Sequence, residues 1–396
     1  MNARWAFFDR ARSWLILGVV LLHAACGYSR YVPWWHMRGA PSPLADVLVT
    51  GLDVILMPFL FFIAGCFAPA SAAKVSAGGF VAKKARRLLA PIAPLVFFFL
   101  PAMVYAGYRQ RTADPAGFFD FWRASLAGLA NFRPWCIASL QQALSSQNSL
   151  SQHHLWFLTL LFLFFLVYRF TPGLGALLAG RPRSLGLAWL CAGAAVAAAM
   201  TALGTAMPIG VWWRWNIVLL LQPVRLPLYA AAFLLGAQAG LRGRDFERLR
   251  TGRAWPSLAG AAAALAAVFV LGPAVYVPGP APAGAMALYA TALVAANGLL
   301  LLGCLRLGAA QPRPLSPAEA VLARGSYDIY LLHMPLVVFA AFALPAALAP
   351  SLAMLLVTVA AATASLALGA LGRRLGPVAS FAGLLAFFIG MCLAFP

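Results

Sequence analysis

The sequence predicts an all-α protein, a polytopic transmembrane helix bundle of about 10–11 spans with its N-terminus in the cytoplasm. Three observations support this fold class. Hydrophobic residues make up 63% of the 396 residues and charged residues only 10%, whereas soluble domains carry roughly 45–50% and about 25%. The apolar residues are gathered into runs of about 20, the length that crosses a bilayer. The basic residues concentrate in alternate connections between these runs.

Each predicted helix corresponds to one apolar run, and we identify eleven runs. In chain order they are 13–28, 45–67, 88–108, 154–170, 185–207, 224–241, 255–275, 284–305, 326–344, 352–371 and 378–395. The last run also fits an interfacial or re-entrant segment, so the number of spans stays at ten or eleven.

The basic residues orient the bundle. With the N-terminus in the cytoplasm, the cytoplasmic connections hold 21 of the 29 lysines and arginines. This is the bias of the positive-inside rule. The net charge of +20 would suggest nucleic acid in a soluble protein. Here no basic stripe alternates with stacking aromatics, so we expect a lipid bilayer and not a nucleic acid as the partner.

The longest connection, 109–153, lies on the outer side and contains an amphipathic segment at 118–122. It is too short for a separate soluble catalytic domain. Residues 1–396 are therefore predicted to form a single membrane-embedded domain. The cysteines form no CxxC pair, so we expect no metal site.

Ionisable residues inside a spanning helix are costly and usually functional. Arg12 and His23 are eleven residues apart in the first helix, which places His23 about 16 Å above Arg12. With Arg12 at the cytoplasmic rim, His23 lies near the middle of the membrane, as a general base, a nucleophile, a proton relay or simply a packing residue. Asp53 in the second helix is a candidate carboxylate partner that orients His23, or else a helix-packing residue.

Two further groups of residues suggest a lined site. Tyr327, Tyr330 and His333 recur every three residues and share one helix face, unless the tyrosines are interfacial and the histidine packs. A basic cluster precedes the third helix. Its residues can bind a phosphate-rich ligand, and they can also orient the protein in the membrane by the positive-inside rule. Its members are Lys83, Lys84, Arg86 and Arg87. His153 and His154 open the fourth helix on the outer side, as acceptor-side or packing residues.

In combination these residues resemble the acyltransferase family 3 membrane proteins, and most closely their glucan-modifying, succinyltransferase-like branch. The run from Asp9 through Arg12 to His23 is similar to the family's opening Asp-x-x-Arg and Arg-x10-His motifs. The run from Ser326 to Pro335 is similar to its Ser-Tyr-x-x-Tyr-Leu-x-His-x-Pro signature. The remaining matching blocks are Met57 to Gly65, Arg86 to Pro91, Leu155 to Leu158, and Arg225 to Pro227. Where the family has Arg-x-x-Arg, this chain has Lys84 in the first place.

The resemblance implies an O-acyltransferase in a bacterial inner membrane. Its donor would be a cytoplasmic acyl-CoA, acetyl-CoA before succinyl-CoA, and its acceptor a hydroxyl of an envelope or periplasmic carbohydrate. The catalytic residues would be His23, His333, Tyr330 and Asp53, and the donor-binding residues Arg12, Lys84, Arg86 and Arg87. The alternative is a proton-coupled transporter or flippase that uses His23, Asp53 and His333 as a relay.

Overall fold

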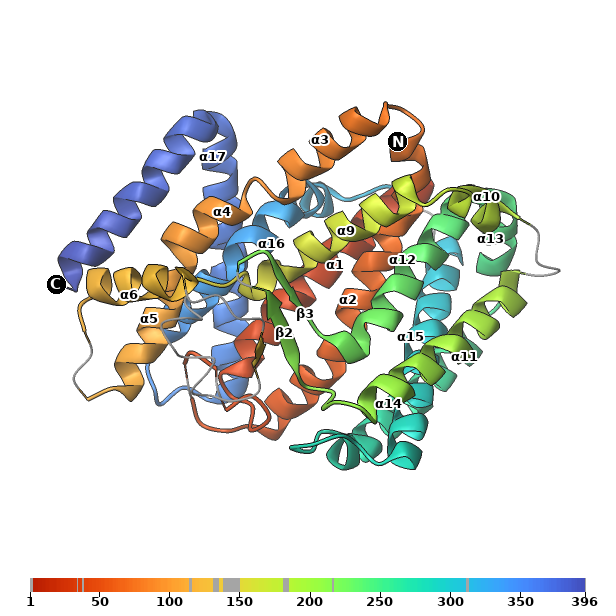
Figure 1. Ribbon diagram of the computed structural model, residues 1–396, viewed down its shortest axis with the longest axis horizontal. Helices are drawn as coiled ribbons and strands as arrows, with labels where there is room; N and C mark the ends of the chain where they lie inside the picture. The colour runs from red at the N-terminus through yellow and green to blue at the C-terminus, as the bar shows by residue number, and fades with distance from the viewer. Residues whose placement is uncertain are drawn as a thin grey trace.

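The computed structural model describes residues 3–33, 35–37, 39–113, 116–130, 135–137, 150–180, 185–215, 217–310 and 313–395. Over these residues it is a helix bundle (Figure 1), and nine of its described helical segments are long and apolar enough to cross a membrane. The predicted polytopic helical fold is confirmed.

The first helix, α1 (Ala3–Cys26), is not among those nine, because its first turns carry Asp9, Arg10 and Arg12. It nevertheless packs along α2 (Pro43–Ala72), α16 (Pro317–Ala343) and α17 (Pro350–Ala394). Arg10 and Arg12 have partners on α16, and Asp9 pairs with Arg12, so the helix stays inside the bundle.

The contact between α2 and α12 (Leu226–Leu241) depends on glycines. A Cβ atom on Gly65 would lie 2.1 Å from the Phe233 carbonyl oxygen, and one on Gly236 would lie 2.1 Å from that of Phe62. Small residues let the two backbones approach closely, which is the usual basis of helix association in lipid.

The predicted helix 88–108 is broken into shorter pieces. These are α3 (Ala77–Leu88), α4 (Ile92–Pro94), the π-helical segment η1 (Leu95–Phe99) and α5 (Leu100–Arg111). Pro91 and Pro94 lack the N–H that a continuous helix needs, which explains the break. The last piece is followed by α6 (Phe118–Ala130), so the amphipathic segment is helical.

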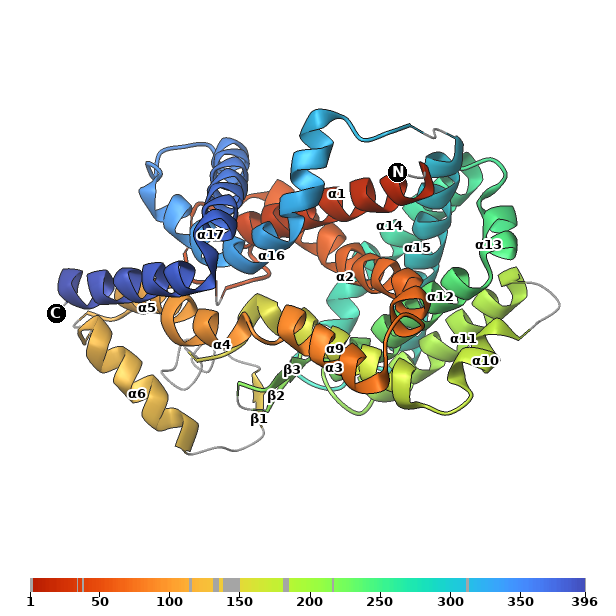
Figure 2. The same ribbon diagram turned by 90° about the horizontal axis from the view of Figure 1, so that it is seen from above.

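A small antiparallel sheet, which the sequence did not predict, has the order β1 (Trp135–Ile137), β2 (Trp212–Trp215), β3 (Leu219–Leu221). It lies beside α9 (Trp156–Phe170) in Figure 2. The Arg214 guanidinium donates to the Leu150 carbonyl at 2.9 Å. Burial lowers the pKa of Arg214 to about 10, so it stays charged at neutral pH. The sheet thus anchors the segment that enters η2 (His153–Leu155).

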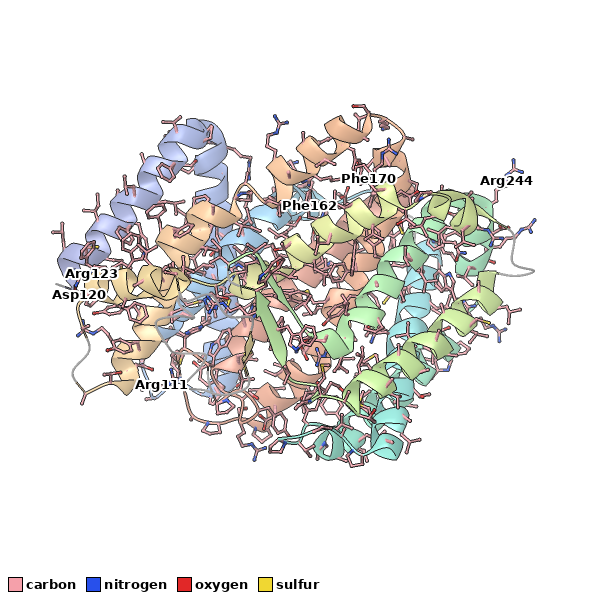
Figure 3. The ribbon with its side chains drawn as sticks, in the orientation of Figure 1. Arg111, Asp120, Arg123, Phe162, Phe170 and Arg244 are labelled. Carbon is pink, nitrogen blue, oxygen red and sulfur yellow. The ribbon has the colours of Figure 1, made fainter. Side chains whose placement is uncertain are left out.

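The remaining elements are η3 (Pro223–Arg225), α10 (Leu174–Ala179), α11 (Leu185–Gly204), α13 (Gly243–Arg250), α14 (Trp255–Val275) and α15 (Ala283–Ala310). Arg244 in α13 and Arg111 at the end of α5 lie at opposite sides of the molecule (Figure 3).

The last helix bends. Gly376 has φ 85° and is followed by Pro377, so α17 consists of two limbs that diverge (Figures 1 and 2). The second limb returns along α5 and α6, where the Phe395 carbonyl accepts a hydrogen bond from the Phe118 N–H at 2.8 Å. The two predicted runs 352–371 and 378–395 correspond to these limbs.

Candidate active site

All five histidines of the sequence lie in one cluster, although they come from α1, the 27–42 connection, η2 and α16. The ring centroids of His23 and His333 are 5.0 Å apart, and those of His154 and His333 are 4.7 Å apart. His23 and His154 are separated by 6.4 Å, and His36 and His153 by 5.9 Å. Of these five histidines, the sequence predicted His23 and His333 as catalytic and offered His153 and His154 as acceptor-side or packing residues.

His23 and His333 form a direct hydrogen bond, with His23 Nδ1 2.8 Å from His333 Nε2. The other nitrogen of His333, Nδ1, lies 3.0 Å from the Ile329 carbonyl oxygen and 2.9 Å from that of Tyr330. Carbonyl oxygens only accept, so Nδ1 of His333 carries the proton. In the neutral ring, Nε2 of His333 is then an acceptor, and His23 Nδ1 must be the donor.

This assignment determines the chemistry of His23. With its proton on Nδ1, the neutral ring has a lone pair on Nε2. His23 is only half-buried, and the described residues provide no hydrogen-bond partner for Nε2. Trp35 stacks on the ring, with centroids 5.5 Å apart and planes 6° from parallel. The imidazole is thus held in one orientation with a basic nitrogen available for a proton.

Trp35 reaches this position because the 27–42 connection folds back onto the bundle. Its indole is buried, and its backbone carbonyl accepts a hydrogen bond from Arg111. Next to it, burial and then the charges of His153 and Arg111 lower the pKa of His36 well below its usual range. His36 is therefore neutral at neutral pH. The sequence reasoning missed Trp35 and His36, because nothing in their local pattern shows that this connection turns inward.

Tyr330 supports the site indirectly. Its hydroxyl donates to the backbone carbonyl of His154, and His154 Nε2 lies 3.2 Å from the carbonyl of Leu331. These two bonds join α16 to the start of α9. His153 adopts a left-handed conformation, with φ 43°. The two adjacent imidazoles consequently contact different partners, His153 near His36 and His154 near His333.

The structure does not bring Asp53 to His23. The Asp53 carboxylate lies 2.5 Å from the guanidinium of Arg225, which is buried and also donates to the hydroxyl of Tyr276 at 2.5 Å. The Nδ1 proton of His23 is already donated to His333. The relay of His23, Asp53 and His333 that a transporter would use is therefore not assembled in this structure.

At the other end of α1, Arg12 joins two helices. Its guanidinium bonds to the Asp9 carboxylate at 2.9 Å, to the Ser326 hydroxyl at 3.2 Å and to the Ala323 carbonyl at 3.2 Å. The positive charge of Arg87 also acts on this guanidinium. This end of the site is electropositive.

The basic cluster before α4 divides into two kinds of residue. Lys84 places its ammonium 3.6 Å from the centre of the Phe165 ring, a cation–π contact that docks α3 on α9. Arg86 and Arg87 are exposed. The backbone carbonyl of Arg87 accepts from the Tyr327 hydroxyl, and its guanidinium lies over the Tyr327 ring. Arg87 is therefore the member of the cluster that contacts α16, and its charge acts on Arg12.

Among the described residues, no group of three or more His, Cys, Asp or Glu side chains is arranged to hold a metal ion. The five imidazoles are instead connected to carbonyl groups, aromatic rings and one another.

Comparison with known proteins gives one match. Residues 5–372 match the model of a family described as an acyltransferase domain. No curated protein and no solved structure matches the chain. The match covers nearly the whole chain, including both helices of the histidine pair, and the protein therefore belongs to acyltransferase family 3, whose members are enzymes that transfer acyl groups.

Proposed function

We propose that this multi-pass membrane enzyme is an O-acyltransferase of a bacterial inner membrane. It takes an acyl group from cytoplasmic acyl-CoA, acetyl-CoA first and succinyl-CoA as the alternative. The acceptor is a hydroxyl of an envelope or periplasmic carbohydrate. The observation that carries this proposal is the lone pair of His23 Nε2, fixed by His333 and without a partner among the described residues.

The imidazole supplies what the reaction needs. A hydroxyl is a poor nucleophile at neutral pH and requires a base. His23 Nε2 accepts the hydroxyl proton while the oxygen bonds to the acyl carbon. The carbon–sulfur bond of the thioester then breaks, its electron pair goes to sulfur, and the thiolate regains the proton from the imidazolium. The hydrogen bond to His333 keeps Nε2 as the accepting atom throughout.

The donor end is supported by the two guanidinium groups. Coenzyme A is rich in phosphate, and arginine binds phosphate through charge-assisted, often bidentate, hydrogen bonds. Arg12 is eleven residues before His23 on the same helix, a distance of about 16 Å. The extended pantetheine arm, which separates the phosphates from the sulfur, would bridge it. Lys84 is secondary, since its ammonium is already placed on Phe165.

The test uses the full-length protein in proteoliposomes with acetyl-CoA or succinyl-CoA, and measures free thiol in the presence of envelope glycans. Mass spectrometry of glycans from cells with and without the protein identifies the ester. We expect thiol release and one new acyl mass, both lost in His23→Ala. Unchanged glycans together with no thioester consumption would contradict the proposal.

A further inference from the structure

The second imidazole of the site with a defined lone pair is that of His154. Its Nε2 lies 3.2 Å from the Leu331 carbonyl oxygen, which can only accept, so Nε2 carries the proton. In the neutral ring Nδ1 is then an acceptor. His154 is only 5% exposed, and its Nδ1 has no hydrogen-bond partner in the described structure.

A buried acceptor without a donor is rare, because burial removes the hydrogen bonds that water would have made. The other tautomer, with the proton on Nδ1, would not remove this cost, since Nε2 would then lose its hydrogen bond to the Leu331 carbonyl. The neighbouring His333 cannot supply a proton either, because its only N–H is directed at the carbonyls of Ile329 and Tyr330. None of the described residues supplies the donor that Nδ1 needs, and a bound molecule can supply it.

The position of His154 Nδ1 indicates what kind of molecule donates a hydrogen bond to it. The His154 ring lies 4.7 Å from that of His333 and 6.4 Å from that of His23. Two of the imidazoles that contact His333 thus have a bare nitrogen, His23 Nε2 and His154 Nδ1, and both of these nitrogens accept hydrogen bonds. A single hydroxyl has one proton and can satisfy only one of them. Two hydroxyls on neighbouring carbons can satisfy both.

We propose that His154 Nδ1 binds a second hydroxyl of the acceptor, next to the hydroxyl whose proton goes to His23. The acceptor class is then a vicinal diol, as in polyols and sugar rings, and His154 is a specificity-determining residue. This inference rests on the proposed function, because it requires His23 to be the base for a hydroxyl acceptor.

The experiment compares propane-1,2-diol with propan-1-ol as acceptors for acetyl-CoA, using the purified full-length protein. Both carry a primary hydroxyl, and they differ by the neighbouring one. The readout is the ratio of the two values of kcat/KM, which cancels differences in folded protein and in donor binding. Wild type should favour the diol by about tenfold or more.

In His154→Leu the ratio should fall to within about twofold of one, since the acceptor nitrogen is gone. In His154→Gln it should be retained, because the amide can donate to Leu331 and accept from the hydroxyl. His154→Phe keeps a ring against His333 and Tyr330 but has no acceptor nitrogen, so its ratio should also fall to near one. If only the glutamine variant is active, that result also supports the inference.

Either of two outcomes for the kcat/KM ratio would overturn the inference. One is a wild-type ratio near one, and the other is a His154→Leu or His154→Phe ratio equal to that of wild type; in either case only water occupies Nδ1. Thioester hydrolysis by wild type without transfer to either alcohol would also count against it. Failure to consume the thioester at all would contradict the proposed function instead.

Discussion

The proton position on His23 is set by two carbonyl groups on another helix. Ile329 and Tyr330 fix the proton of His333, and His333 in turn fixes that of His23. A general base typically contributes 10²- to 10⁴-fold to a rate.

His23→Ala should therefore lower the transfer rate by at least about a hundredfold. The protein should still insert, because alanine makes α1 more apolar. Transfer is measured in membranes at matched protein levels, with His23→Gln as the near-isosteric comparison. Retention of more than about a tenth of the wild-type rate would remove His23 from the role of base.

His333→Ala should have a smaller effect, since the hydrogen bond of His333 to His23 assigns it a positioning role. Without it, a neutral His23 can place its proton on either nitrogen, so kcat should fall while the donor KM stays near the wild-type value. Activity should also fall as the pH is lowered in wild type, because an imidazolium cannot accept a proton. A pH–rate profile identical in wild type and His333→Ala, with equal kcat, would show that His333 has no such role.

Arg87→Ala should raise the apparent donor KM by roughly ten- to a hundredfold, because one charge-assisted phosphate contact is lost. The matched control is Lys83→Ala, which removes one positive charge from an exposed position of the same helix. If both variants raise the donor KM equally, the cluster acts through its overall charge.

Among the elements, the contact between α2 and α12 is the one that a single methyl group should disturb. Gly236→Ala would place a Cβ 2.1 Å from the Phe62 carbonyl oxygen, in a backbone that cannot move aside independently. We expect a loss of about 1–3 kcal/mol, visible as a lower thermal unfolding temperature in detergent. Gly298→Ala in α15, where no atom lies within 4 Å of the added Cβ, should leave this temperature unchanged. Equal temperatures for the two variants would contradict the packing argument.

The elements also show how far sequence reasoning reaches. Apolar runs predicted where helices lie, because lipid demands about 20 apolar residues whatever the neighbours are. They could not predict the break at Pro91 and Pro94, since proline is tolerated in spanning helices where other groups take up the freed bonds. The apolar pattern placed Asp53 in α2 but could not show which segment would face it. In the structure that segment is η3, whose Arg225 forms an ion pair with Asp53. The sheet was missed because its short strands are paired only by tertiary contact.

For the whole molecule, the charge distribution predicts one orientation. The α13 helix should be cytoplasmic and α6 should be outside. In a cysteine-free background, Arg123→Cys should react with an impermeant maleimide added to intact cells, and Arg248→Cys should react only after the membrane is opened. Both residues are exposed. Labelling of position 248 from outside would reverse the topology and with it the assignment of donor and acceptor sides.

The pairing of α1 with α16 has a consequence for the order of synthesis. Arg10 binds Glu319, Arg12 binds Ser326 and His23 binds His333, and the last two residues are 310 positions apart. At about 5–20 residues per second, a ribosome makes His333 roughly 15–60 s after His23. During that interval the first helix is in the membrane with two arginines and an imidazole that have not met their partners on α16. These unpaired polar groups expose the nascent protein to quality control. The site is completed only when α16 inserts beside α1.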